Sequence, residues 1–317
     1  MDETDLLICR ELLMNSRQSY REIAEKLGIS VNAVHKRVQA LIDSQIIRRF
    51  RTYLNIHFLQ AINVNILGKT SVKSINLLEK NLGRNDQTYW ITLGAGGWTY
   101  IGGYLKSIAQ LDEFMKFVIN TGNISDPILG ISKTFVLQKT LDDLHPIDFL
   151  ILGELQYDAR KNASEIAEKL GISAKTVNKH IQYMAENNMI YFSVEFFPDG
   201  KNDIMPFFHI TIEDNADAGN IILQLYQTFP KSLLYAESYS NLPHFIFAPF
   251  WVDSFRRIDE IREQFASIPG IKTYEINMMF KGIILETWRD KLIQDRVAEY
   301  QKLKFESDMD WIKFSPN

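Results

Sequence analysis

Hydrophobic positions at the amino-terminal end of the chain recur at helical spacing, and the same pattern returns 143 residues later. Each copy predicts a first helix with one apolar face, formed by Ile8, Cys9 and Leu12 and then by Ile151, Leu152 and Leu155. Residues 5–47 and 148–190 share nineteen identities in forty-three positions, among them the octapeptide IAEKLGIS. This fixed register marks an internal duplication.

Two more helices follow the first one in each copy. The second is predicted over residues 20–27 and ends at Gly28, where the absence of a side chain lets the chain turn. Ser30 can cap the third helix, whose core face is predicted to hold Val31, Val34, Val38 and Leu41. Helix, short glycine turn and helix predict a helix-turn-helix, and we call each such unit a reader.

The third helix leaves polar side chains on its outer face. Amide, imidazole and ammonium groups can bond with base edges and phosphates in a major groove. A β-prone segment with three arginines follows at 46–53, and guanidinium forks suit phosphate oxygens, so it is predicted to be a wing that grips the DNA backbone. The predicted DNA-binding residues are Ser30, Asn32, His35, Lys36, Gln39, Arg48, Arg49 and Arg51, with Lys175 and Lys179 from the second copy.

The second reader is more acidic than the first. Lysine and arginine outnumber aspartate and glutamate by nine to seven in residues 1–60, whereas residues 143–200 have five against nine. The second predicted wing, 191–196, contains no arginine and one glutamate. The second reader is therefore expected either to contact DNA through its lysines or to bind another protein. A chain with one basic reader is expected to form a homodimer or a higher homo-oligomer on double-stranded DNA.

The segments between and after the readers also repeat, at offsets of 146 to 147 residues. Strand alternation and helical spacing predict the order βαββαβ, with last strands near 131–137 and 274–280. The predicted fold class is α+β, with two winged helix-turn-helix domains and two ferredoxin-like domains in tandem. Their predicted bounds are 1–60, 61–142, 143–200 and 201–285, with a carboxyl-terminal helix and tail at 286–317. Each ferredoxin-like sheet has one face without helices, and the two copies can cover each other.

Composition narrows the chemistry further. The 317 residues carry a net charge of −4, six histidines without metal-ligand spacing, and one cysteine, Cys9, which excludes an internal disulfide. Cys9 stands where the second copy has Leu152, so a buried core position is expected. No metal and no cofactor are predicted. Apolar stretches such as 245–252 are too short to cross a bilayer and the first residues are acidic, so a cytoplasmic protein without membrane contact is expected.

The combined pattern resembles the Lrp/AsnC family of transcriptional regulators. It comprises Asp-x-x-Ile-Cys/Leu-x-x-Leu, then Arg17 or Arg160, then Ile-Ala-x-x-Leu-Gly-Ile-Ser, an arginine-rich strand and a βαββαβ domain. The resemblance covers the chain twice, down to residue 285. It implies a sequence-specific DNA-binding transcription regulator whose effector domains pair through their sheets and bind amino acids or other small metabolites between subunits. The chain resembles such a dimer fused into one polypeptide.

A glycine-rich turn is the candidate effector site that this resemblance implies. Relatives have Gly-Tyr/Trp-Asp between the middle strands, whereas this chain has Gly97-Trp98-Thr99, and the second copy lacks the motif. The candidate ligand-binding residues are Gly94, Gly96, Gly97, Trp98 and Thr99. The same glycines could instead form a simple hairpin, and the sequence favours the hairpin.

An enzymatic alternative shares the architecture, because sirohaem decarboxylases combine the same helical units with βαββαβ domains. Those enzymes need histidines and basic residues around a tetrapyrrole. This chain has His209 and His244 in its second ferredoxin-like unit and no histidine in residues 61–144. His244 is interpreted as a surface or packing residue. No catalytic residue is predicted, and the chain is expected not to be an enzyme.

Overall fold

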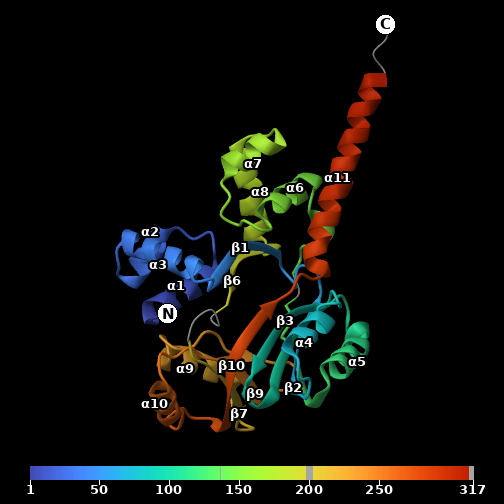
Figure 1. The fold of residues 1–317 in the computed structure, drawn as a ribbon. Helices are drawn as coiled ribbons and strands as arrows, with labels where there is room; N and C mark the ends of the chain where they lie inside the picture. The colour runs from blue at the N-terminus through green and yellow to red at the C-terminus, as the bar shows by residue number, and fades with distance from the viewer. Residues whose placement is uncertain (136, 198–202, 314–317) are drawn as a thin grey trace.

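The computed structural model describes residues 1–135, 137–197 and 203–313, and for residues 303–313 it describes the backbone alone. Two small helical units, a large β-sheet with helices on its outside and one long terminal helix make up the molecule (Figure 1). The α+β class and the duplicated unit predicted from the sequence are confirmed.

Each reader consists of three helices followed by one strand. The elements are α1 (Glu3–Met14), α2 (Tyr20–Leu27), α3 (Val31–Asp43) and β1 (Ile47–Leu54), then α6 (Pro146–Leu155), α7 (Ala163–Leu170), α8 (Ala174–Glu186) and β6 (Ile190–Phe196). Gly28 and Gly171 have φ of 66° and 69° after the second helix of each copy, a conformation that favours glycine. Ser30 and Ser173 then accept hydrogen bonds from backbone amides of the following turn and cap α3 and α8.

The ferredoxin-like units join edge to edge into one eight-stranded sheet. The first unit contains β2 (Ile62–Thr70), α4 (Ile75–Leu82), β3 (Thr88–Gly94), β4 (Trp98–Leu105), α5 (Leu111–Gly122) and β5 (Ile124–Ile131). The second contains β7 (Met205–Ile212), α9 (Ala218–Thr228), β8 (Glu237–Ser238), β9 (Phe245–Pro249), α10 (Phe255–Phe265) and β10 (Ile271–Ile284). The strand order is β5-β2-β4-β3-β10-β7-β9-β8, so each unit keeps the same internal order and β3 pairs with β10 between units.

The sheet curls so that the helix-free faces of the two units meet. Ser132 forms an isolated bridge with Tyr239, which brings the ends of the two edge strands β5 and β8 together. Inside, Tyr100 of the first unit lies against Phe207 and His209 of the second, with ring centroids 5.0 and 5.6 Å apart. The prediction that the two copies cover each other is therefore confirmed.

Helix α11 (Trp288–Lys313) begins at the junction of readers and sheet and extends away from the molecule (Figure 1). Its first turns pack on α6, where Val297 and Tyr300 lie against the core of the second reader. The helix predicted within 286–317 is thus present, and its first turns dock on the second reader of the same chain.

Two local predictions were wrong. The last strand of the first unit is β5, 124–131, and not 131–137, because Asn123 ends α5 in a left-handed conformation and the strand starts at once. Val31 is 45% exposed although it was predicted to face the core, because it is the first residue of α3 and lies beyond the packed face.

Candidate nucleic-acid interface

The outer face of α3 is accessible, as predicted. Asn32, His35, Lys36 and Gln39 are all exposed, whereas Val34, Val38 and Leu41 pack in the core of the first reader. Lys36 forms no ion pair with any described residue, so its ammonium group is free to meet a phosphate. Ser30 is exposed as well, but its side-chain oxygen already accepts a hydrogen bond from the Ala33 amide at 3.1 Å.

Equivalent side-chain contacts fix the recognition helices against the first helix of each reader. Arg37 on α3 lies 2.7 Å from Asp5, and His180 on α8 lies 2.7 Å from Asp148, the same two positions in the repeat. Arg37 also pairs with Asp2 at 2.7 Å. Burial opposes ionisation of the Asp2 carboxyl, but the hydrogen bond from the Asp5 amide and the contact with Arg37 together hold its pKa below the ordinary range. The orientation of each outer helix face is therefore set by its own reader.

The second recognition helix has an outer face of similar chemistry. Lys175 and Lys179 are exposed on α8, and so are Asn178 and Gln182, which the sequence analysis did not single out. The 143-residue offset could have found these two, because they are the repeat equivalents of His35 and Gln39. The second face therefore offers two ammonium and two amide groups, which is at least as cationic as the first.

Two equivalent arginines lock the readers together. Arg17 donates to the carbonyls of Ala159 and Lys161, at 2.5 and 3.3 Å, across the contact between the two copies. Arg160 donates in return to the carbonyls of Ser16 and Gln18, at 2.8 and 2.9 Å. These four carbonyls occupy repeat-equivalent positions, so the contact is reciprocal, as in the interface of a two-fold symmetric dimer. The two readers form one unit within a single chain.

The predicted wings do not extend outward from the readers. Strand β1 pairs with β6 along its length in antiparallel register, with Thr52 opposite Phe192 and Leu54 opposite Ile190. The strand that follows each reader therefore binds the strand of the other copy. The resulting two-stranded ribbon joins the readers to each other above the eight-stranded sheet (Figure 1). The two strands are partners in one ribbon, so the predicted difference in DNA binding between a basic first wing and an acidic second wing does not apply.

Arg51 is a correction, because its guanidinium is buried and already neutralised. The residue is 2% exposed, and its two terminal nitrogens lie 2.9 Å from Glu195 and 2.9 Å from Asp290. The first carboxylate comes from β6 and the second from the start of α11. Arg51 thus ties three elements together, and it is not available to a phosphate in this conformation.

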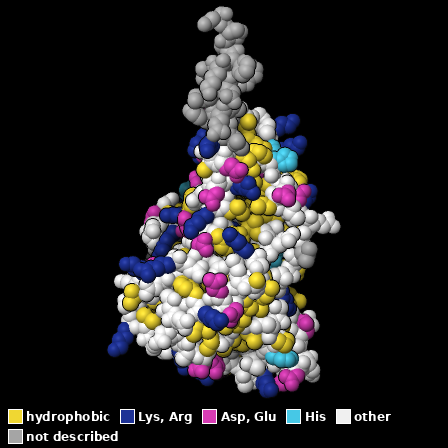
Figure 2. Space-filling view, turned by 90° about the vertical axis from the view of Figure 1, so that its right-hand side faces the viewer, with side chains coloured by type: hydrophobic (Ala, Val, Ile, Leu, Met, Phe, Trp, Pro, Cys, Tyr) yellow, Lys and Arg dark blue, Asp and Glu magenta, His cyan; other side chains and the backbone are white. Residues whose placement is uncertain are grey.

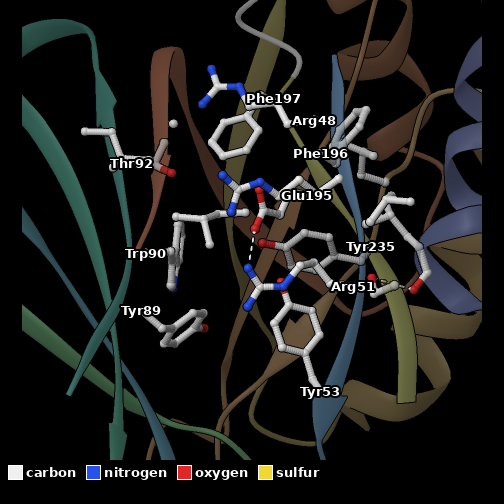
Figure 3. A pocket seen from close by; sticks show the side chains of 18 of the residues that line it. Arg48, Arg51, Tyr53, Tyr89, Trp90, Thr92, Glu195, Phe196, Phe197 and Tyr235 are labelled. Carbon is white, nitrogen blue, oxygen red and sulfur yellow. Dashed lines mark hydrogen bonds and ion pairs between the residues drawn. The ribbon is translucent and has the colours of Figure 1, made fainter. Parts of the chain in front are cut away.

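Arg48 and Arg49 are exposed, but they line a cleft between the reader ribbon and the sheet. The cleft has a volume of about 780 Å³ and is bounded by β1, β6, α1, β3, β10 and the start of α11. The Arg48 guanidinium lies 3.6 Å from the centre of the Phe197 ring. Figure 3 shows the two side chains next to each other. These two arginines therefore face the interior junction of the molecule, and we no longer assign them to the DNA backbone.

The glycine turn has the geometry of a hairpin. Gly94 ends β3, residues 95–97 form a tight turn, and β4 starts at Trp98. Gly96 and Gly97 have φ of 67° and 82°, and the buried Thr99 hydroxyl donates to the Gly97 carbonyl at 3.3 Å. None of the five candidate ligand residues is among the described residues that line the cleft.

The cysteine and the two histidines considered in the sequence analysis lie in surroundings that indicate packing rather than chemistry. Cys9 is fully buried and burial raises the pKa of its thiol. His209 is 5% exposed, lies 3.0 Å from the Tyr100 hydroxyl, and has its pKa lowered to about 4 by burial, whereas His244 is exposed. Among the described residues no cluster of three or more metal-ligand side chains occurs. None of the helices in the described part of the chain combines the length with the apolar composition that a membrane span requires.

The effector half shows no competing nucleic-acid surface on the face seen in Figure 2. Lysine and arginine side chains alternate there with aspartate and glutamate, and apolar side chains lie between them. A polyanion is held by a continuous positive field, which this mixture does not supply. The exposed faces of α3 and α8 remain the best candidates for DNA contact.

Comparison with known proteins agrees with this geometry. A model described as winged helix-turn-helix DNA-binding matches residues 1–48 and again residues 144–191. An uncharacterised HTH-type transcriptional regulator of Pyrococcus horikoshii is 34% identical over 136 residues, which is 42% of this chain and 87% of that protein. The HTH-type transcriptional regulator LrpA of the same organism is 44% identical over 55 residues, 17% of this chain and 39% of LrpA.

The architecture of the whole chain also has a solved counterpart. The crystal structure of the siroheme decarboxylase NirDL is similar over 95% of this chain and 100% of that chain, with a TM-score of 0.57 and 11% identity. NirDL has also been solved in co-complex with an iron-uroporphyrin III analogue. At this identity the likeness extends to the fold alone. The chain is 34% identical to a regulator that it covers over 87% of its length, and its helix-turn-helix occurs twice. The chain therefore belongs to the Lrp/AsnC family of HTH-type transcriptional regulators.

Proposed function

We propose that one chain binds one DNA duplex with both readers, and so acts as a sequence-specific transcription regulator. The observation that carries this proposal is the reciprocal contact of Arg17 and Arg160, which fixes two exposed recognition helices as a symmetric pair. A two-fold pair of readers matches an operator with two inverted half-sites. The chain itself supplies the symmetry that single-unit regulators obtain by dimerising.

The exposed side chains divide into two roles. Lys36, Lys175 and Lys179 supply sequence-independent affinity for phosphates. The amide groups of Asn32, Gln39 and Gln182 can form paired hydrogen bonds with adenine, which would supply sequence selection. In this arrangement the second reader takes part in DNA binding, which is the first of the two roles left open by the sequence.

We still propose a homodimer or a higher homo-oligomer, but not as the means of bringing two readers together. Two readers already sit on one chain, so a second chain is not needed to occupy two half-sites and would instead add a second pair. Multi-angle light scattering of the free protein and of its DNA complex distinguishes these arrangements. One chain per two half-sites supports the present proposal, and two chains per two half-sites contradicts it.

An enzymatic role is not favoured. Sirohaem decarboxylases are expected to need histidines around their tetrapyrrole, whereas the described lining of the cleft includes five arginines and no histidine. We therefore propose that the chain is not an enzyme. We also propose that it works in the cytoplasm, as expected for a DNA-binding regulator. Incubation with sirohaem, followed by absorbance spectroscopy and mass analysis, should return the tetrapyrrole unchanged. Release of its carboxyl groups as carbon dioxide would reverse this assignment.

The sequence specificity is tested by selecting bound duplexes from a random pool. The proposal predicts an enriched inverted repeat whose two half-sites are both protected by one chain. Selection of a single half-site, or no enrichment at all, would contradict reading by both helices. Because each mismatch costs about 1–3 kcal/mol, single-base changes in either half-site should lower affinity by about fivefold or more.

A further inference from the structure

The cleft between the reader ribbon and the sheet carries more positive than negative charge. Its described lining contains five arginines and three carboxylates, which are Arg10, Arg48, Arg49, Arg51 and Arg289 against Glu195, Glu286 and Asp290. All three carboxylates lie within 4.0 Å of Arg51, at 2.9, 4.0 and 2.9 Å. The other four arginines form no ion pair with any described carboxylate. The cleft is therefore an uncompensated cationic site.

Arg289 is a buried cation of this site whose hydrogen bonding is incomplete. The residue is 4% exposed, and one terminal nitrogen donates to the Tyr191 hydroxyl at 3.0 Å. Its Nε is buried without a hydrogen-bond acceptor among the described residues. A buried cation without a counter-charge costs free energy, so such a group normally has an anion to meet. In this structure the Arg289 guanidinium stacks on the rings of Tyr53 and Tyr104, at 4.3 and 4.7 Å from their centres, and no described carboxylate lies within 4.0 Å of it.

The walls of the cleft are largely aromatic. Ten aromatic side chains line it, namely Tyr53, Tyr89, Trp90, Tyr104, Tyr191, Phe196, Phe197, Phe207, Tyr226 and Tyr235. In Figure 3, Tyr53 and Tyr89 lie below Arg51, Trp90 lies across the cleft from Arg51, and the Phe197 ring lies beside Arg48. Flat rings and guanidinium planes bind other flat rings by stacking. A volume of about 780 Å³ lies in the upper part of the range for small-molecule sites.

We propose that this cleft binds a planar aromatic molecule carrying several carboxylates, with its ring among the tyrosines and its acidic groups at Arg48, Arg49 and Arg289. Guanidinium groups bind carboxylates in a two-point fork, which fits acidic groups at the edge of a flat ring. The neutral amide and hydroxyl groups apart from tyrosine are Gln45, Thr92 and Ser193. That is a small set for reading the edge of a nucleotide base, so the carboxylate class is preferred to a nucleotide.

The position of the cleft connects this ligand to the readers. Arg48 and Arg49 belong to β1, which starts four residues after the end of α3, and β1 pairs with β6, which starts four residues after α8. An occupant that holds the ribbon against the sheet would therefore change the freedom of both recognition helices. This part rests on the proposed function, whereas binding of the ligand does not.

Isothermal titration of the full chain tests binding directly. The probes are uroporphyrin, as a planar polycarboxylate, benzenehexacarboxylate, as carboxylates without a wide ring, and ATP, as an aromatic phosphate. Uroporphyrin should bind saturably with one site per chain and at least about tenfold more tightly than the other two. Absence of a saturable site for uroporphyrin, or tighter binding of ATP, would overturn the proposal.

The matched variants are Arg48→Gln with Arg49→Gln in the cleft, and Arg256→Gln with Arg262→Gln on the exposed side of α10. The cleft pair should lower the affinity for uroporphyrin by about tenfold or more, because each substitution removes a charge-assisted contact. The α10 pair should leave this affinity unchanged. Equal affinity in both pairs would overturn the site. Arg289→Gln is a third variant, and circular dichroism reports whether it folds.

DNA titration separates the two proposals. With saturating uroporphyrin, the affinity for a selected duplex should change by about fivefold or more in the unmodified chain and not in the Arg48/Arg49 pair. Unchanged DNA affinity with intact uroporphyrin binding would overturn the coupling alone. Failure of the chain to bind any duplex would overturn the proposed function and leave the titration of the cleft intact.

Discussion

At the scale of single residues, the readers are held by arginines that meet carbonyls and carboxylates inside the chain. Arg17 and Arg160 bind carbonyls across the pseudo-symmetric contact, and burial lowers the pKa of each guanidinium without removing its charge. Arg51 joins β1 to β6 and α11 through Glu195 and Asp290. The same residue type therefore sets the geometry of the reader pair at three points.

Replacing Arg160 with alanine should destabilise the reader pair. The change removes two charge-assisted hydrogen bonds and leaves the Ser16 and Gln18 carbonyls without these donors, so the free energy of unfolding should fall by about 2 kcal/mol. Arg160→Lys should recover part of this loss, because an ammonium group cannot span both carbonyls. Urea unfolding measures the change, with the exposed Arg21→Ala as the control. Equal midpoints for Arg160→Ala and Arg21→Ala would refute the role given to this contact.

His209 should make stability depend on pH. Burial lowers its pKa from 6.5 to about 4, so the unfolded chain takes up the proton first as the pH falls. The contribution of neutral His209 to the free energy of unfolding is fully present above about pH 6.5 and is lost as the pH falls toward 4. Between pH 7.5 and 5 the unmodified chain should lose about 2 kcal/mol more than His209→Gln.

The comparison isolates His209, because other titrating groups act in both proteins. Glu237 is one of them, since burial raises the pKa of its carboxyl and gives a dependence of opposite sign. Urea unfolding at the two pH values is the measurement. Parallel losses in the two proteins would contradict a neutral buried His209.

At the scale of elements, local determinants made the readers predictable and distant pairing made the wings unpredictable. Gly28 and Ser30 fix the turn and the cap of α3 through their own neighbours, so the sequence indicates them directly. The partner of β1 lies more than a hundred residues away, and the alternation of side chains in a strand does not reveal which strand it will pair with. The three arginines of β1 were therefore assigned to an outward wing.

Binding-site residues follow the same rule. The exposed face of α3 could be read from helical spacing, and Asn178 and Gln182 could have been read from the repeat offset. The cleft could not, because its lining comes from readers, sheet strands and α11 together. A guanidinium suits phosphate, carboxylate and carbonyl alike, so only the fold decides which of them Arg48, Arg49 and Arg51 meet.

The contact between α6 and α11 depends on a glycine. A β-carbon at Gly153 would lie 2.8 Å from Cγ2 of Val297, so the helices approach too closely for a larger side chain. Gly153→Leu should displace the start of α11 and destabilise its docking by about 1–3 kcal/mol. Hydrogen exchange of the α11 amides measures this change. The double variant Gly153→Ala with Val297→Ala removes the clashing methyl groups, so its α11 amides should be protected as in the unmodified chain. Unchanged exchange in Gly153→Leu would contradict the close packing of α6 on α11.

At the scale of the whole molecule, duplication builds a symmetric dimer inside one chain. The ferredoxin-like units share one sheet, the readers share a reciprocal contact, and the ribbon of β1 and β6 connects the two halves. The copies have since diverged in charge, yet each recognition helix keeps a lysine at the same repeat position, Lys36 and Lys179. That retained pair is the basis for expecting both readers on DNA.

The salt dependence of DNA binding tests this account most directly. Fluorescence anisotropy with a selected duplex would be measured from low to high salt for Lys36→Ala, Lys179→Ala, the double variant and, as a control, Lys116→Ala on α5. Each reader variant should flatten the slope of log affinity against log salt by about 0.9 and the double variant by about twice that, while the control keeps the original slope. If Lys179→Ala keeps the original slope while Lys36→Ala flattens it, the second reader does not touch DNA and the paired-reader account is wrong.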